Sequence, residues 1–327
     1  MKIVFVGGTG RCGTSIVRKL FTRHSQITSL SFESRFIIDP NGILDFYGSF
    51  TNLWSPYLAH SKLKMLESML MDVTKYSLFH GTIDKLLTFC KVKKYLTPKR
   101  YASWELRKFV PLFDKYVTEL IAELEDFSFN GFWYGSESYT PLPRLHYSAP
   151  KKREDIAVVL GDFIRKVYGY LLEKENAILY LEDCPFNILF AKGILEILPE
   201  AKFLHVARDP RDVVSSFCNS NWAPTNKKQS ALYFKDIMER WFVVRDSIPI
   251  DCHYEIKLED LVNKSEATIN NVCEFMGLEF EHDMLNVDLS KSNIGRWEKE
   301  FTQSEKKMTQ NILKDVVEKL GYREWFH

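Results

Sequence analysis

A glycine-rich turn near the amino terminus most strongly limits what this chain can fold into. It spans residues 7–13 and follows a β-branched and aromatic run at residues 3–6, which is typical of a buried parallel strand. Residues 14–23 then carry apolar side chains at helical spacing and predict a helix. A strand, a glycine-rich turn and a helix in this order predict a loop that binds phosphate at a helix amino terminus.

Residues 8–15, Gly-Thr-Gly-Arg-Cys-Gly-Thr-Ser, match three kinds of phosphate-binding loop. They fit the dinucleotide fingerprint G-x-G-x-x-G, with Glu33 about 20 residues further on as the ribose-binding acid. They nearly fit G-x-x-x-x-G-K-[ST], but Thr14 occupies the lysine position. They also fit a loop for a single phosphate, with Arg11 as an additional cation. A tight turn without a ligand is the competing interpretation, and the loop alone does not choose among the three ligands.

A second candidate anion site lies in residues 203–217, where an apolar strand is followed by a turn and a helix. The strand brings Arg208 to its carboxyl end, the edge at which open α/β sheets bind ligands. Ser216 follows eight residues later, two turns into the predicted helix. A guanidinium and a hydroxyl together can hold a second phosphate. An arginine–aspartate network at the start of a surface helix is the alternative.

Strands and helices alternate through the rest of the sequence. Strands are predicted at residues 26–33, 177–181, 201–207 and 253–258, and helices at residues 155–172, 188–198, 211–219 and 266–276. This alternation predicts an α/β class, a three-layer P-loop-like fold with a central parallel sheet. Aromatic residues, lysines and helical periodicity from about 40 to 150 predict a mostly helical insertion. We expect this insertion to belong to a single domain, residues 1–327.

Composition and charge exclude several functional classes. The formal net charge of +1 provides no global field for nucleic acid or an anionic membrane. No stretch approaches the ~20 apolar residues of a membrane span. The six cysteines have no C-x-x-C spacing and form no metal-ligand pattern with the eight histidines. The chain opens with no signal-peptide pattern. We therefore expect a cytoplasmic protein that needs no metal, nucleic acid or membrane span.

Both anion motifs resemble those of the PAPS-dependent sulfotransferases, and most closely the tyrosylprotein and bacterial members. Residues 11–15 resemble the 5′-phosphosulfate loop, and residues 203–217 resemble the 3′-phosphate motif. Residues 182–187, 258–262, 295–297 and 321–322 also resemble family segments, so that the likeness covers residues 1–35 and 155–325. It implies PAPS as co-substrate and PAP as product. The implied nucleotide-binding residues are Arg11, Cys12, Gly13, Thr14, Ser15, Arg208, Ser216, Gly295, Arg296 and Trp297.

The resemblance also implies catalytic roles. Residues 32–35, Phe-Glu-Ser-Arg, resemble the Glu-Thr-Arg of tyrosylprotein sulfotransferases. By this likeness Glu33 is the general base, Arg35 contacts the acceptor, and Arg11 neutralises charge on the leaving phosphate. From the residues alone, an exposed glutamate before a helix is an equally good interpretation of Glu33.

Two positions depart from the family pattern. Asp183 stands where the tyrosylprotein enzymes have a lysine that assists catalysis, so either Lys192 replaces that cation or Arg11 acts alone. Leu258 replaces an aromatic residue that contacts the donor. The candidates for stacking on adenine are Trp241, Trp297 and Tyr254, and for each a position in the core is the favoured alternative.

The acceptor is left open by the sequence. We expect the helical insertion at about 40–150 to shape the acceptor side of the site. An aromatic-rich pocket there would suit a phenol or tyrosine, a carbohydrate, or another small molecule such as a lipid. A homodimer is also compatible with the sequence. Three rival functions are a P-loop-type nucleotide kinase, an NAD-dependent oxidoreductase and a catalytically dead nucleotide-binding protein. The missing loop lysine argues against the kinase, and the second anion motif argues against the oxidoreductase.

Overall fold

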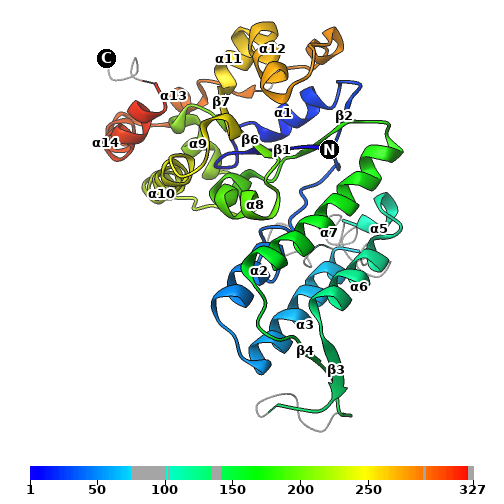
Figure 1. The fold of residues 1–327 in the computed structure, drawn as a ribbon. Helices are drawn as coiled ribbons and strands as arrows, with labels where there is room; N and C mark the ends of the chain where they lie inside the picture. Colours follow the sequence, from blue (N-terminus) through cyan, green and yellow to red (C-terminus); the bar gives the residue numbers. More distant parts are fainter. Residues whose placement is uncertain (75–100, 102–103, 134–140, 290–291, 323–327) are drawn as a thin grey trace, which may run out of the picture. The chain divides into compact units, whose positions relative to one another are not determined.

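The computed structural model describes residues 1–74, 101, 104–133, 141–289 and 292–322 (Figure 1). The chain divides into two compact units. The sheet unit consists of Lys2–Glu33, Asn176–Leu195 and Glu200–His327. The helical unit consists of Met1, Ser34–Glu175 and Glu196–Pro199. Because the chain passes between them several times, neither unit is one continuous stretch of sequence.

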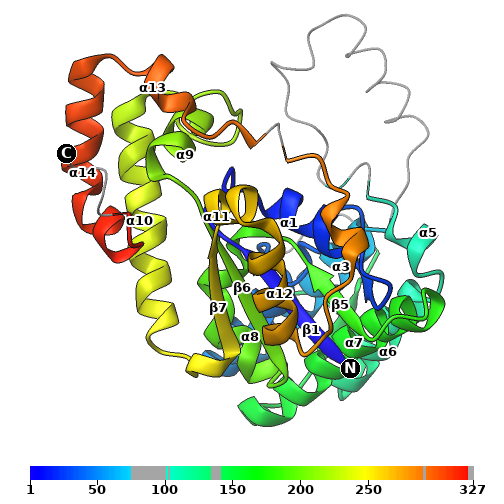
Figure 2. The ribbon, with the colours of Figure 1, turned by 90° about the horizontal axis from the view of Figure 1, so that it is seen from above.

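The sheet unit contains five parallel strands in the order β2-β5-β1-β6-β7 (Figure 2). Their bounds are β1 Lys2–Gly7, β2 Ile27–Thr28, β5 Leu179–Glu182, β6 Ala201–Ala207 and β7 His253–Lys257. The predicted α/β fold with a central parallel sheet is confirmed, and β6 has the predicted bounds.

The strand predicted at residues 26–33 is much shorter than expected. Only Ile27 and Thr28 pair with β5. Beyond them the Leu30 carbonyl accepts hydrogen bonds from the Ser29 hydroxyl and from Arg18, so side chains replace the sheet ladder there. A strand end that is satisfied by side chains leaves the following residues in a loop, and Glu33 lies in that loop.

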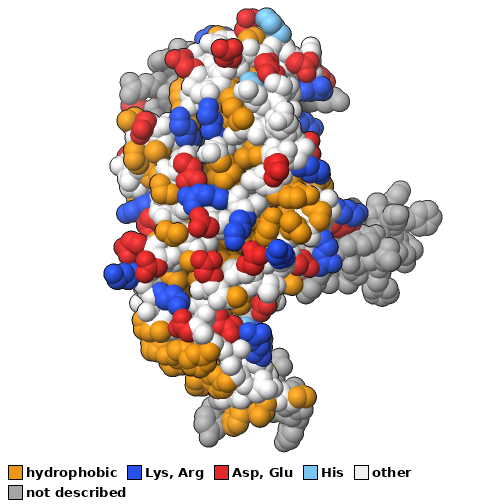
Figure 3. Space-filling view, turned by 45° about the vertical axis from the view of Figure 1, so that its right-hand side comes forward, with side chains coloured by type: hydrophobic (Ala, Val, Ile, Leu, Met, Phe, Trp, Pro, Cys, Tyr) orange, Lys and Arg blue, Asp and Glu red, His pale blue; other side chains and the backbone are white. Residues whose placement is uncertain are grey.

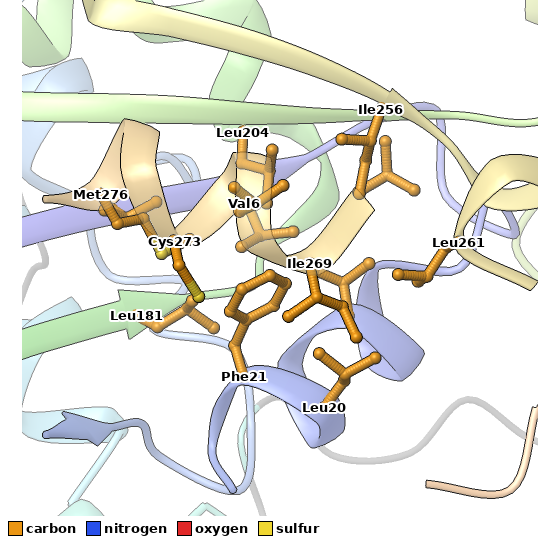
Figure 4. Packing of buried hydrophobic residues seen from close by; sticks show 14 of the residues in the cluster. Val6, Leu20, Phe21, Leu181, Leu204, Ile256, Leu261, Ile269, Cys273 and Met276 are labelled. Carbon is orange, nitrogen blue, oxygen red and sulfur yellow. The ribbon is translucent and has the colours of Figure 1, made fainter. Parts of the chain in front are cut away.

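Helices cover both faces of the sheet. One face packs on α1 (Thr14–Phe21), α11 (Leu258–Asn263) and α12 (Ser265–Met276) through a cluster of fully buried aliphatic and aromatic side chains (Figure 4). On the other face the rings of Phe5 and Phe203 stack 5.5 Å apart. There η2 (Pro185–Phe190) contacts β1 and α10 (Lys227–Arg245). Burial on both faces explains why β1 is apolar from Ile3 to Val6 and why the apolar residues of β6, which also contains Lys202 and His205, do not alternate with polar ones.

Short elements complete the sheet unit. They are α8 (Ala191–Ile197, whose last two residues group with the helical unit), α9 (Pro210–Phe217), η3 (Ile250–Cys252), η4 (His282–Leu285), α13 (Arg296–Glu300) and the longer α14 (Gln303–Lys319). A capping box formed by Thr302 and Glu305 starts α14, which packs on α10.

The helical unit contains α2 (Ile43–Asn52), α3 (Pro56–Asp72), α5 (Leu106–Phe109), α6 (Phe113–Leu124) and α7 (Arg153–Lys174). In the described part of residues 40–150, these helices confirm the predicted helical character. Helix α7 was predicted as part of the α/β pattern, but it packs on α2 and α6. Its buried stripe, which includes Ile156, Leu160 and Val167, therefore belongs to a helix–helix core.

A hairpin of β3 (Phe127–Asn130) and β4 (Arg144–Tyr147) extends the helical unit and was not predicted. Exposed hydrophobic side chains in and beside this hairpin include Phe127, Phe129, Phe132 and Leu142. Figure 3 shows hydrophobic side chains gathered in the lower part of the face that it draws. Within the described residues, no helix has both the length and the hydropathy that a membrane crossing requires.

Candidate active site

The candidate site lies at the carboxyl edge of the sheet, where parallel strands end together. Strand β1 leads into the phosphate loop, which we define as residues 8–15. Strand β6 leads to Arg208, β5 to Asp183 and β7 to Leu258. Segments more than 240 residues apart in sequence therefore supply side chains to one edge of the sheet unit.

The two predicted anion motifs line one pocket of about 210 Å³. Its lining residues are Arg11, Gly13, Thr14, Ser15, Ile16, Arg208, Ser216, Leu258, Ser292, Asn293 and Arg296. Seven of them were predicted as nucleotide contacts from the sequence, and they come from three separate segments. The pocket therefore has cationic and hydroxyl groups on its walls, which suits a ligand with more than one anionic group.

The phosphate loop depends on residues with positive φ. Gly10, Arg11 and Gly13 have φ values of 76°, 58° and 105°. Gly13 is the N-cap of α1, and a Cβ there would lie 2.9 Å from Cδ1 of Leu258. A glycine N-cap leaves the first-turn N–H groups without a side-chain cap, and such groups bind anions.

Cys12 contributes to the loop in a different way from its neighbours. Its side chain is 2% exposed and belongs to the core cluster beneath the sheet face. Burial raises the pKa of its thiol, so the thiol stays protonated. Of the predicted loop contacts, Cys12 can therefore offer a ligand only its backbone.

The loop and the second motif contact each other directly. The Arg11 Nε donates to the Ser216 hydroxyl over 2.9 Å. A guanidinium nitrogen of Arg208 donates to the Arg11 carbonyl oxygen over 3.1 Å. Because Arg208 holds the backbone from which the Arg11 side chain extends, the two cations are positioned together.

Arg208 is the most deeply buried cation of the pocket, with 7% of its surface exposed. Its other terminal nitrogen donates to the Asn293 carbonyl over 2.7 Å and lies 3.6 Å from the Asp212 carboxylate. Its Nε is buried and has no hydrogen-bond partner among the described residues. A buried guanidinium with one unused donor favours an anionic ligand, because unsatisfied buried charge is costly.

Asp212 organises the third wall of the pocket, and no sequence pattern pointed to this role. It is fully buried, and its two oxygens accept hydrogen bonds from the backbone N–H groups of Gly295 and Trp297. The Arg211 guanidinium lies 3.7 Å from the centre of the Trp297 ring. Trp297 is therefore engaged by Arg211 and is not a lining residue, whereas Arg296 lines the pocket and pairs with Glu300.

The turn between β6 and α9 carries a second buried carboxylate. Asp209 caps α9 by accepting from the Arg211 N–H and pairs with the Arg211 guanidinium. Burial raises the pKa of Asp209 to about 6, although Arg211 acts in the opposite direction. Glu259 accepts from the Asp209 N–H and from the Tyr322 hydroxyl, which connects this turn to the start of α11.

Glu33 and Arg35 are placed differently from the lining residues. Glu33 is half-buried in the loop after β2, and β5 separates β2 from β1. Glu33 therefore follows a strand that is not a direct neighbour of the phosphate-loop strand. Arg35 belongs to the helical unit and forms an ion pair with Asp39, 2.9 Å away.

Asp183 stands at the position of the family lysine, and Lys192 was the suggested replacement for that cation. Asp183 is 5% exposed and forms an ion pair with Arg18 at 2.8 Å. Lys192 is exposed on α8 and is not among the residues that line the pocket. Arg18 is therefore the cation that the structure brings to Asp183, and the sequence had not pointed to it.

The aromatic candidates for adenine lie elsewhere in the sheet unit. Trp241 is 1% exposed and packs against His205, and Tyr254 stacks on Phe275 near the start of β7, away from the carboxyl edge. The aromatic ring that does contact the phosphate loop is Trp222, which approaches Gly10 so closely that a Cβ there would lie 2.6 Å from it. Trp222 is half-exposed and its position after α9 carried no motif.

Comparison with known proteins supports a family assignment. A model described as "Sulfotransferase family" matches residues 65–282, which include Arg208 and Ser216 but not the phosphate loop. Curated relatives from Mycobacterium bovis and Mycobacterium tuberculosis are omega-hydroxy-beta-dihydromenaquinone-9 sulfotransferases. Each is 27% identical over 155 residues, which cover 43% of this chain and 38% of the relative. The chain thus spans about two-fifths of the length of these relatives.

Two solved structures are also similar to the chain. The sulfotransferase domain from the curacin biosynthetic pathway has a TM-score of 0.48 and 14% identity, over 97% of both chains. The sulfotransferase domain from the Synechococcus PCC 7002 olefin synthase has a TM-score of 0.43 and 15% identity, over 95% of this chain and 87% of that one. The assignment rests on the family model, which covers well over half of the chain: this protein belongs to the sulfotransferase family.

Proposed function

We propose that this protein transfers a sulfuryl group from PAPS to an acceptor hydroxyl and releases PAP. The observation that carries the choice of donor is the meeting of Arg11 and Arg208 in one pocket, linked through Ser216 and the Arg11 carbonyl. PAPS has a phosphosulfate on one side of its ribose and a phosphate on the other. ATP and NAD lack the second ribose phosphate, so neither would need the buried Arg208.

In the proposed reaction the acceptor oxygen attacks the sulfur atom in line with the bond that breaks. A new O–S bond forms, the bond between sulfur and the phosphate oxygen of PAPS breaks, and PAP leaves with that electron pair. Glu33 takes the acceptor proton, and Arg11 with the first-turn N–H groups of α1 neutralises charge on the departing phosphate. Arg35 is proposed as an acceptor contact. The chemistry requires no metal.

The role proposed for Glu33 has a structural basis of its own. The loop that carries Glu33 follows β2, and all five strands of the sheet are parallel, so this loop starts at the same edge as the phosphate loop. Glu33 is half-buried, which suits a carboxylate that must exchange a proton with a bound ligand. We also propose that the two units together form one sulfotransferase domain, because the chain passes from one unit to the other several times along its sequence.

The acceptor class can be narrowed by a relative. The mycobacterial relatives are named for a hydroxylated menaquinone, an apolar molecule with a terminal hydroxyl. We therefore propose a long-chain or aromatic alcohol as the first acceptor to assay, ahead of carbohydrates and tyrosine peptides.

A thermal-shift panel with PAP, ATP with Mg²⁺, and NAD tests the choice of donor. A ligand that binds the native state raises the melting temperature, so we expect stabilisation by PAP and none by the other two. A response to ATP with Mg²⁺ or to NAD, without one to PAP, would refute the proposal in favour of a kinase or an oxidoreductase.

Glu33→Gln tests the proposed base. The variant should bind PAP as the wild type does, because Glu33 does not line the donor pocket. Its rate of transfer from labelled PAPS should fall by about 10²–10⁴-fold, the usual contribution of a positioned base. Unchanged turnover would remove Glu33 from the mechanism. The matched control is Glu298→Gln, an exposed glutamate on α13 that should leave the rate unchanged.

A further inference from the structure

Arg18 connects three elements at the carboxyl edge of the sheet. It lies in the second turn of α1, the helix whose first turn supplies Thr14 and Ser15 to the donor pocket. Its Nε donates to an Asp183 oxygen over 2.8 Å. Its Nη1 donates to the Leu30 carbonyl over 3.3 Å. One guanidinium therefore joins the helix of the phosphate loop, the end of β5 and the loop after β2.

The pairing with Asp183 is buried enough to hold the guanidinium in place. The Asp183 side chain is 6% exposed and that of Arg18 is 18% exposed. Burial raises the pKa of Asp183, and Arg18 is the cation that opposes this rise. A buried carboxylate without its counter-ion is strongly unfavourable, so loss of either partner of the Arg18–Asp183 pair should be costly.

The contact with Leu30 acts on the loop that carries Glu33. Strand β2 contains only two residues, so the sheet ladder ends at Thr28. Leu30 is 2% exposed, and its carbonyl accepts from both the Ser29 hydroxyl and Arg18. Only two residues, Ser31 and Phe32, separate Leu30 from Glu33. The position of Glu33 therefore depends on an anchor that extends from the helix of the phosphate loop.

We propose that the Arg18–Asp183 pair is a positioning pair that holds residues 29–33 in register with the phosphate loop. The inference rests on the proposed function in that Glu33 is taken as the base. Neither Arg18 nor Asp183 lines the donor pocket, so the pair acts through the residues that it orients and not by contact with the donor. An error of about 1 Å in the placement of a reacting group can cost about 10²-fold in rate, which sets the scale of the expected effect.

Two variants test the pair. Arg18→Lys keeps a positive charge near Asp183 but cannot donate to Asp183 and Leu30 in the same fork geometry. The double variant Arg18→Ala/Asp183→Asn removes the anchor without leaving a buried unpaired carboxylate, so it serves if Arg18→Ala alone fails to fold. Arg23→Lys is the matched control, because Arg23 is exposed just beyond the same helix.

The first measurement is amide hydrogen exchange of a peptide that covers residues 29–33. Both variants should exchange there about tenfold or more faster than the wild type, with peptides of β1 and β6 unchanged, because only the local anchor is lost. Arg23→Lys should match the wild type. Wild-type exchange in residues 29–33 of the double variant would overturn the proposal. This result does not require that any acceptor has been identified.

The second measurement is a split between binding and turnover. We expect kcat to fall about 10–100-fold in both variants while the Kd for PAP stays within about threefold. A fall in PAP affinity equal to the fall in kcat would show a general loss of structure and overturn the positioning role. If the wild type neither binds PAP nor transfers sulfate, the proposed function fails, and the exchange measurement still decides whether the pair anchors the loop.

Discussion

The pocket is lined on one side by the phosphate loop and on the other by Arg208 and Ser216, and these two sides can bind anions by different means. The phosphate loop offers backbone groups at a helix start, and its shape depends on the positive φ of Gly10, Arg11 and Gly13. The segment from the end of β6 through α9 offers side chains instead, and two of these, Arg208 and Ser216, are almost fully buried. Backbone N–H groups at a helix start can bind the phosphates of many different ligands, whereas a buried guanidinium requires an anionic group at one fixed position. Under the proposed function, the second side is therefore the one that selects the nucleotide.

Arg208→Ala should break this comparison most strongly. Removing a buried cation from a charged hydrogen-bond network costs about 2–5 kcal/mol, so PAP affinity should fall by about 30-fold or more. The affinity for 5′-AMP, which lacks the 3′-phosphate, should change little. Calorimetric titration of both nucleotides checks this. Arg211→Ala, in the same turn but paired with Asp209, is the control and should keep the preference for PAP.

Asp209→Asn tests the charge balance of the same turn through its pH dependence. The folded-state pKa of about 6 lies above the ordinary 3.8, so the folded protein binds this proton more tightly than the unfolded chain. The contribution of Asp209 to the free energy of unfolding of the wild type is therefore fully present below about pH 4 and is lost as pH rises through 6.

Asparagine cannot ionise, so the variant should gain about 3 kcal/mol of stability relative to the wild type between pH 4 and pH 7. Urea unfolding at several pH values measures this difference. A difference that does not vary with pH would contradict the burial of an ionised Asp209. A stability difference between variant and wild type that is the same at every pH would reflect the hydrogen bond from the Arg211 N–H and not the charge of Asp209.

Gly13→Ala tests the backbone side of the pocket. Its φ of 105° and the contact with Leu258 should cost about 1–3 kcal/mol of stability. Affinity for PAP and for 5′-AMP should fall by the same factor, because this loop does not read the 3′-phosphate. Gly169→Ala is the control, since no atom lies within 4 Å of a Cβ there, and it should not destabilise the protein. A loss confined to PAP would contradict the comparison.

Ser216→Ala should have the smallest effect. The loss of one hydroxyl contact is worth about 1 kcal/mol, so PAP should bind about fivefold more weakly and 5′-AMP as before. Ser215→Ala is the control, because that hydroxyl bonds Glu300 and lies outside the pocket lining. If 5′-AMP weakens as much as PAP, Ser216 acts by orienting Arg11 and does not contact the 3′-phosphate.

Much of the sheet unit was predictable because its strands are buried on both faces. Such strands are short apolar runs bounded by turns, which is why β1 and β6 were located correctly. Helix α10 was not predicted, although Asn226 is a good N-cap and Phe234, Met238 and Trp241 follow at helical spacing. An N-cap followed by this spacing is a helix signal in the sequence itself.

The parts of the site that sequence could not reveal are long-range pairings. Arg18 and Asp183 are 165 positions apart, and nothing local to either residue indicates the other. The Asn293 carbonyl that Arg208 contacts is a backbone group, which no residue pattern specifies. Asp212 has the same character, since it binds the backbone of residues 295 and 297. Motifs located seven of the residues that line the pocket, and packing decides which residues hold them.

The most direct test of the account is the ratio of the Kd values for 5′-AMP and PAP, measured on the wild-type protein at one salt concentration. The buried Arg208 with its unused Nε, together with Ser216, should make PAP bind at least about 30-fold more tightly. Equal affinities would mean that this side of the pocket does not recognise a 3′-phosphate and would contradict the proposed donor.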